Sequence, residues 1–197
     1  MTKLKCAFIV ACIFLLHTRL RAQRFMHSYG ATISVVTGKS VDAFGGSSSV
    51  TLLQTSFCYF PRYNVTESEN SSVSIGLPLA LGVGLSSNTY DGTSGVAFAY
   101  EVPLAIDYNF GYKSTMENDS RTGGYLGVGF SYYRITIAGA YTDFTGVTYG
   151  PVFRAGLRYA SGGQREAGHG TTVGFFLKQG IEKSHLITFG FHVLVDL

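Results

Sequence analysis

Large apolar residues recur at every second position through the last eleven residues of the chain, and this period-two pattern constrains the fold more than any other feature. The intervening positions carry small or polar residues, with Leu194 as the one apolar exception. Side chains of a β-strand point alternately to opposite faces, so the pattern predicts a strand with one apolar and one small or polar face. The apolar positions are Ile187, Phe189, Phe191, Val193, Val195 and Leu197.

Seven earlier segments repeat this alternation, so that the chain carries eight in all. The eight segments span residues 28–35, 53–59, 73–85, 96–110, 126–133, 147–159, 172–178 and 187–197. The second face is mainly Gly, Ala, Ser and Thr, which suits the interior of a narrow barrel that side chains must fill. We therefore predict an all-β fold, an eight-stranded antiparallel up-and-down transmembrane β-barrel whose large apolar face meets lipid.

The first 23 residues have the layout of a secretory signal peptide. Lys3 and Lys5 precede an apolar run over residues 6–16, which is too short to span a bilayer as a helix, and a polar segment ending in Ala22–Gln23 follows. We predict cleavage after Ala22 or Gln23, and we take residues 24–197 as the barrel domain. The second reading of this segment, a lipid attachment at Cys12, is disfavoured because the apolar run continues past the cysteine.

Removal of residues 1–23 changes the charge balance. Four basic residues and no acidic residue are lost, so the formal net charge falls from +3 to −1. Nucleic-acid binding requires clustered surplus positive charge, so we expect no nucleic-acid partner. Cys58 remains as the single cysteine, which excludes an intramolecular disulfide. The composition, with 14% charged residues and a mean hydropathy of +0.19, is too apolar for a typical secreted enzyme.

The predicted connections between strands are of similar length at both ends of the barrel. If the N-terminus lies in the periplasm, the outer connections fall at about 40–47, 86–95, 138–146 and 180–184. The periplasmic connections then fall at about 61–71, 111–123 and 161–170. Outer loops are normally the longer ones. Either the strands extend beyond the membrane or one of these boundaries is misplaced.

The candidate site is a set of charged residues on the lumen-facing side of the predicted strands. We expect Glu101 to pair with Arg154 or Lys178, and Asp107 or Asp196 to pair with Arg158, because unpaired charges in a low-dielectric interior cost several kcal/mol each. Such pairs act either as a structural filling or as a narrow polar path. The residues are Glu101, Asp107, Arg154, Arg158, Lys178 and Asp196.

Catalytic and metal motifs are weak in this sequence. The histidines have no ligand spacing, so we expect no metal and no cofactor. Ser184 and His185, with Glu182 nearby, are the only arrangement related to a lipid hydrolase. We expect a non-catalytic protein. An outer-membrane enzyme acting on lipid A or phospholipid, and a soluble periplasmic ligand-binding barrel, remain the alternatives.

The sequence resembles the small outer-membrane barrels of the OmpA/OmpX type, and it is especially similar to the outer-membrane β-barrel domain proteins of Bacteroidetes-type bacteria. The resemblance covers the whole chain and rests on the signal ending at Ala22–Gln23, the Gly-rich alternation and the last strand. It implies a location in the bacterial outer membrane, contact with its lipids, and a monomer. It also implies that the barrel-assembly machinery reads Phe189, Phe191, Val193, Val195 and Leu197, although Leu197 stands where Phe is usual.

Overall fold

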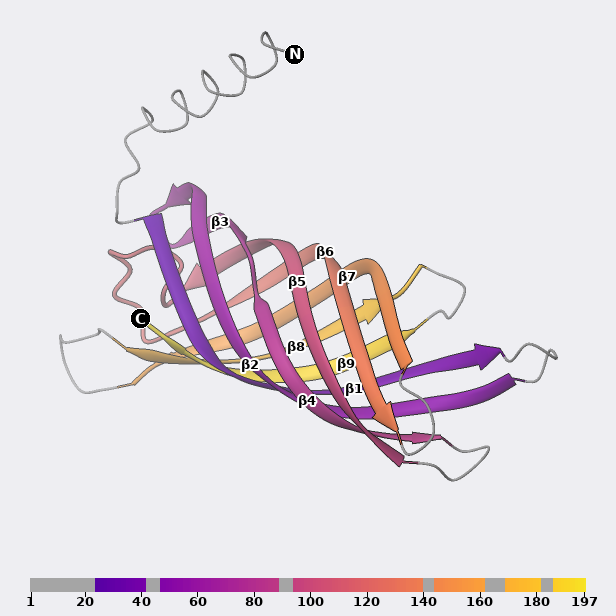
Figure 1. Ribbon diagram of the computed structural model, residues 1–197. Coiled ribbons are helices and arrows are strands. Elements are labelled where there is room, and N and C mark those ends of the chain that lie inside the picture. Colours follow the sequence, from indigo (N-terminus) through magenta and orange to yellow (C-terminus); the bar gives the residue numbers. More distant parts are fainter. Residues whose placement is uncertain (1–23, 42–46, 89–93, 140–143, 162–168, 182–185) are drawn as a thin grey trace, which may run out of the picture.

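The computed structural model describes residues 24–41, 47–88, 94–139, 144–161, 169–181 and 186–197. Nearly all of them lie in nine antiparallel strands (Figure 1). Within these ranges, no helix is both long and apolar enough to cross a membrane. The strands are β1 (Phe25–Val41), β2 (Ser47–Ser68), β3 (Ser71–Gly76), β4 (Leu79–Asn88), β5 (Ser94–Gly111), β6 (Thr122–Gly139), β7 (Phe144–Ala160), β8 (Gly170–Gln179) and β9 (Ile187–Asp196).

The strands close into a barrel. Strand β1 pairs with β2 on one side and with β9 on the other, so the sheet has no open edge. Strands β3 and β4 both lie between β2 and β5 and form one crossing in two pieces. The ring therefore has eight positions, as predicted. The start of β1 lies beside the end of β9, where Ser28 faces Asp196, so both strand ends are at one end of the barrel (Figure 1).

The crossing made by β3 and β4 is interrupted at Leu77 and Pro78. Proline has no amide hydrogen to give to a neighbouring strand. Leu77 still donates its amide to the carbonyl of Pro61 on β2, at 3.0 Å, and the ladder resumes at Leu79 opposite Tyr59. The period-two pattern predicts one uninterrupted strand here, and the structure shows two.

The two faces of the sheet are assigned as the sequence predicts. In β9 every second residue is buried and the others are exposed, with His192 and Asp196 inside and Phe189 and Phe191 outside. The same alternation holds on the other strands. Outward side chains such as Leu81, which is 68% exposed, have no protein layer over them. A closed barrel with a polar interior and an apolar exterior is the arrangement of membrane barrels.

One predicted connection is wrong. We predict a loop over about 61–71, but β2 continues to Ser68 and β3 begins at Ser71, which leaves only Glu69 and Asn70 in the turn. The segment is rich in Ser, Thr, Glu and Asn and resembles a loop in composition, yet its backbone pairs across the hairpin with a register shift at Asn64–Thr66. The strands thus extend further at this end than the apolar pattern indicates.

The β2–β3 turn, the start of β1 and the end of β9 lie at one end of the barrel, which we call the terminal end. We call the other end the opposite end. The β5–β6 connection (residues 112–121) and the β7–β8 connection (residues 161–169) also lie at the terminal end. At the opposite end, short segments join the strands, at 42–46, 89–93, 140–143 and 180–186. Most of those residues lie outside the described part of the chain.

Gly111 gives a first prediction. Its φ of +67° is in the left-handed region, and a Cβ there would overlap the carbonyl oxygen of Thr122. We expect Gly111→Ala to lower the free energy of unfolding by about 1–2 kcal/mol or more, because the left-handed conformation alone costs an L-residue that much. Urea titration of the refolded barrel in detergent measures this. Ser120→Ala, an exposed position in the same connection, is the control, and equal midpoints for the two variants would contradict the assignment.

Candidate functional site

The upper part of the lumen, toward the opposite end, is organised by an ion pair. The ammonium of Lys178 on β8 contacts a carboxylate oxygen of Glu101 on β5. The other oxygen of Glu101 accepts a hydrogen bond from Ser131 on β6 at 2.5 Å. The Lys178 ammonium also lies 4.2 Å from the centre of the Phe176 ring. Lys178 is one of the two partners that we predict for Glu101.

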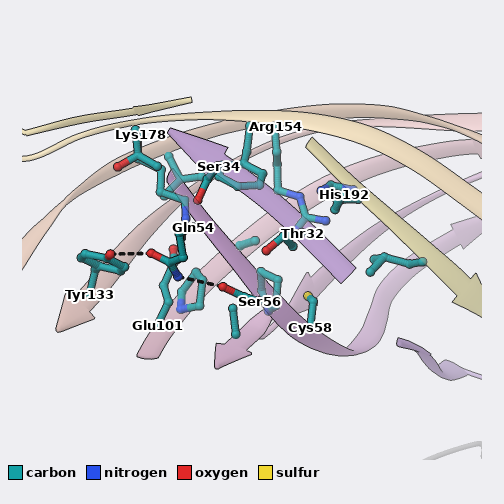
Figure 2. Close-up of a pocket in the computed structure, with 18 of the residues that line it drawn as sticks. Thr32, Ser34, Gln54, Ser56, Cys58, Glu101, Tyr133, Arg154, Lys178 and His192 are labelled. Atoms are coloured by element: carbon teal, nitrogen blue, oxygen red, sulfur yellow. Dashed lines mark hydrogen bonds and ion pairs between the residues drawn. The ribbon is translucent and has the colours of Figure 1, made fainter. Parts of the chain in front are cut away.

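A second polar chain crosses the lumen beside this pair (Figure 2). The hydroxyl of Tyr133 donates to the amide oxygen of Gln54 at 2.6 Å, and the amide nitrogen of Gln54 donates to Ser56 at 2.7 Å. All three side chains are buried. The chain links β6 to β2 across the lumen, so this level of the barrel is bridged by side chains.

Arg154 occupies the middle of the lumen. Its guanidinium lies between the rings of Phe60 and Tyr125, at 4.3 and 4.9 Å from their centres, and its Nε is 3.5 Å from Asp107. It is only 3% exposed. The flat guanidinium is well suited to this sandwich, since it stacks on aromatic faces while keeping its charge. Arg154 therefore packs as a filling group as well as a charge.

His192 fills the neighbouring space by stacking. Its ring is nearly parallel to those of Tyr125 and Phe176, with interplanar angles of 17° and 8°. The hydroxyl of Tyr125 is 2.7 Å from Nε2 of His192. His192 therefore packs beside both rings and is hydrogen-bonded to Tyr125.

The lower lumen differs from the expected pairing. Arg158 donates to the amide oxygen of Asn109 at 2.9 Å, and Arg62 donates to the same oxygen at 2.9 Å. Within the described residues, Arg158 has no ion pair with Asp107 or Asp196, so that prediction is wrong. Asn109 follows Asp107 by two residues on β5 and faces inward beside it, which places its amide oxygen between the two arginines.

Asp196 is held by hydroxyl groups instead of by an arginine. Ser28 on β1 donates to one carboxylate oxygen at 2.5 Å, and Thr172 on β8 donates to the other at 2.6 Å. These strands flank β9, and Ser28 and Thr172 face the same side of the sheet as Asp196. Two hydroxyl donors from the neighbouring strands therefore take the place of the arginine that we predict beside this carboxylate.

The β5–β6 connection closes the terminal end of the lumen. Its residues from Tyr112 to Thr115 are buried. The carbonyl of Lys113 accepts from Arg62 at 2.6 Å, and the carbonyl of Ser114 accepts from Asn64 at 2.8 Å. Burial lowers the pKa of Lys113 below its usual range and raises the pKa of Tyr112. We call residues 112–115 the terminal plug.

The described side chains of the lumen leave a small cavity between two of their layers. A cavity of about 40 Å³ lies between the upper pair and the middle layer, lined among others by Ser56, Cys58, Glu101 and Arg154 (Figure 2). A water molecule needs about 10–15 Å³ of such space, so a cavity of this size is too small for an organic ligand.

Several functional predictions fall on parts of the chain outside the described residues. The signal peptide at 1–23 and the Ser184–His185 pair with Glu182 are among them. In the described ranges, no group of three or more His, Cys, Asp or Glu side chains is arranged to hold a metal ion. Cys58 is buried and unpaired. The residues predicted for assembly recognition lie at outward positions of β9, namely Phe189, Phe191, Val193 and Val195, with Leu197 just after it.

Sequence reasoning missed four important lumen groups. Arg62 was assigned to a connection, although it continues the inward even-numbered positions of β2 through Cys58 and Phe60. The even-numbered position of Arg62 is the sequence signal that identifies it as a lumen residue. Asn109 lies on the small or polar face of the predicted segment 96–110, but its bridging role depends on the register of distant strands. Neither the Tyr125–His192 stack nor the terminal plug has a signal in the local sequence.

The chain was compared with known proteins. No family model matches it, and no curated protein matches it. Among solved structures, the outer membrane protein OprG from Pseudomonas aeruginosa aligns with a TM-score of 0.55 and 11% identity, covering 87% of this chain and 92% of OprG. Neisserial surface protein A aligns with a TM-score of 0.49 and 16% identity over 88% of this chain and 96% of its own. Ail, the attachment invasion locus protein of Yersinia pestis, aligns with a TM-score of 0.49 and 8% identity, over 87% and 95% of the two chains.

These neighbours are small outer-membrane β-barrels. The alignment with OprG, together with the closed ring of eight positions, shows that this chain has the fold of that class. The similarity to barrels of Bacteroidetes-type bacteria remains a prediction from the sequence.

Proposed function

We propose that this protein is an integral barrel of a bacterial outer membrane with a non-catalytic role, structural, adhesive or associated with transport. The observation that carries the proposal is the continuous apolar exterior around a polar interior. Outward side chains from β1 to β9 are exposed and apolar, and inward ones are buried and mainly small or polar. Such a surface is stable against lipid and unfavourable against water.

The soluble alternative is disfavoured by the same observation. A soluble ligand-binding barrel buries its apolar face and offers a charged face to water. Here Glu101, Asp107 and Arg154 are inside, while Leu85, Phe98 and other large apolar groups are outside. The cavity of about 40 Å³ also leaves no space for an apolar ligand.

We propose that side chains fill the lumen, and this supports a scaffold role over an open pore. The upper pair, the Arg154 layer and the terminal plug lie at successive levels between the two ends, and each is held by hydrogen bonds or stacking. We propose no enzyme activity and no cofactor. Outer-membrane lipids and the barrel-assembly machinery are the proposed partners, and the barrel is proposed to act as a monomer with its terminal end in the periplasm.

Conductance across planar lipid bilayers tests the filled lumen. We expect the purified wild-type barrel to insert without producing stable conductance steps, because its side chains leave no continuous aqueous path. A wide porin inserted under the same conditions is the control for detection. Reproducible steps from the wild-type barrel that scale with salt concentration would contradict the filled lumen and favour a transport role.

A further inference from the structure

One charged residue stands out on the lipid-facing side of the barrel. Arg134 on β6 is exposed and points outward, two positions beyond Tyr132. The outward residues that precede it on β6, from Leu126 to Phe130, are large and apolar. Among the described residues Arg134 takes part in no ion pair. A guanidinium at the edge of an apolar surface is a good partner for an anionic group such as a phosphate.

Tyrosines surround this arginine and mark the membrane interface. Arg134 faces Tyr100 on β5 across the strand pair, and Tyr132 faces Tyr149 on β7. The rings of Tyr100 and Tyr132 have centres 6.3 Å apart. Tyrosine girdles lie at the level of lipid headgroups. Arg134 lies toward the opposite end of β6, so its guanidinium reaches the headgroup level of the outer leaflet if the termini are periplasmic.

An apolar groove runs from Arg134 across the outside of the sheet. It has a volume of about 630 Å³ and follows one hydrogen-bonded row of residues over five strands. The pairings along this row join Arg134 to Tyr100, Tyr100 to Leu81, Leu81 to Phe57, and Phe57 to Ala31. Four strand spacings give a length of about 19 Å. The row is perpendicular to strands that tilt by about 35–45°, so it descends by about 11–13 Å, which is most of one leaflet of the hydrocarbon core, about 15 Å thick.

Small residues make the groove. Ala31 and Thr55 point outward between larger neighbours, and Gly30 and Gly82 also line the groove. Thr136, next to Arg134 on the same face, adds a hydroxyl at the charged end and lies 3.3 Å from the hydroxyl of Thr145. The groove therefore has a cationic, hydroxyl-bearing end at the interface and an apolar body within the leaflet.

We propose that this groove binds a phosphorylated lipid of the outer leaflet, lipid A, with a phosphate on Arg134 and one acyl chain along the row toward Ala31. The anionic head and the apolar chain match the two ends of the groove in charge and in length. An Arg–phosphate contact is charge-assisted and often bidentate, and no ion pair among the described residues competes for Arg134. This inference rests on the proposed location in the outer membrane.

Native mass spectrometry of the protein purified from membranes tests the proposal. The barrel is delipidated and titrated separately with diphosphorylated lipid A, dephosphorylated lipid A and phosphatidylglycerol. We expect Arg134→Gln to lower the affinity for diphosphorylated lipid A at least fivefold and Arg134→Lys to restore part of it. Arg121→Gln, an exposed arginine in the β5–β6 connection, is the matched control and should bind as wild type does.

A second variant tests the groove itself. Thr55→Phe fills the apolar body without touching Arg134, and we expect it to weaken binding of diphosphorylated lipid A as well. Unchanged binding in Arg134→Gln or in Thr55→Phe would overturn the proposal, and so would equal affinity for phosphatidylglycerol. Each variant is first checked for a heat-dependent gel shift. A wild-type barrel that lacks this shift would refute the proposed function, whereas a shift without lipid A selectivity would refute only this inference.

Discussion

Replacing Glu101 by Gln is expected to lower the free energy of unfolding by about 3–5 kcal/mol, because it leaves the Lys178 ammonium buried without its counter-charge. The side chains of Glu101 and Lys178 are 8% and 15% exposed, so water screens the pair poorly. Glutamine is nearly isosteric and still accepts a hydrogen bond from Ser131. The loss therefore reports the charge and not the shape of the side chain.

Urea unfolding of the refolded barrel in detergent micelles or lipid vesicles measures this effect. The double variant Glu101→Gln with Lys178→Met removes both charges and keeps an unbranched side chain beside Phe176. We expect it to recover most of the stability, since replacing both members of a buried pair is often nearly neutral. A single variant that unfolds within about 1 kcal/mol of wild type would show that water reaches the pair and that this level of the lumen is open.

Replacing Leu104 by Arg on the outside of β5 is the second large effect that we expect. Leu104 is 52% exposed and lies well inside the run of outward apolar residues that extends from Val96 to Phe110. A charged residue at the bilayer midplane destabilises a membrane barrel by about 2–4 kcal/mol. In a water-soluble barrel the same change at an exposed position would be almost neutral.

Val96→Arg is the matched control for this variant. Val96 lies on the same face of the same strand, near its start at the opposite end of the barrel. The cost of an arginine near the interface falls to about 0–1 kcal/mol. Unfolding in lipid vesicles should therefore separate the two variants. Equal free energies of unfolding for Leu104→Arg and Val96→Arg would contradict the placement of Leu104 near the bilayer midplane and of Val96 near the interface.

The period-two pattern predicted the faces of the strands well, and for a physical reason. Side-chain direction in a strand depends only on parity, so Phe189 and His192 are assigned to opposite faces from the local sequence alone. The number of crossings follows from the number of alternating segments. The length of a strand beyond the membrane cannot be predicted from the apolar pattern, because Ser68 and Ser71 pair in a segment without alternating apolar residues.

Contacts across the lumen were harder to predict. Which residues meet there depends on the stagger of the strands around the whole barrel, and parity says nothing about stagger. Glu101 meets Lys178 although β6 and β7 lie between their strands. Arg158 meets Asn109 in place of an acid for the same reason. The terminal plug was missed because Tyr112 and its neighbours have the composition of an ordinary polar connection.

The most direct test of the central claim, a closed barrel that resides in the outer membrane, is gel migration of the membrane-extracted protein with and without boiling. A closed membrane barrel keeps its ladder of strand pairs in sodium dodecyl sulfate until it is heated, so it migrates as a compact species that shifts on boiling. We expect this shift, with the protein in the membrane fraction. A protein found in the soluble periplasmic fraction, with the same mobility before and after boiling, would contradict the account.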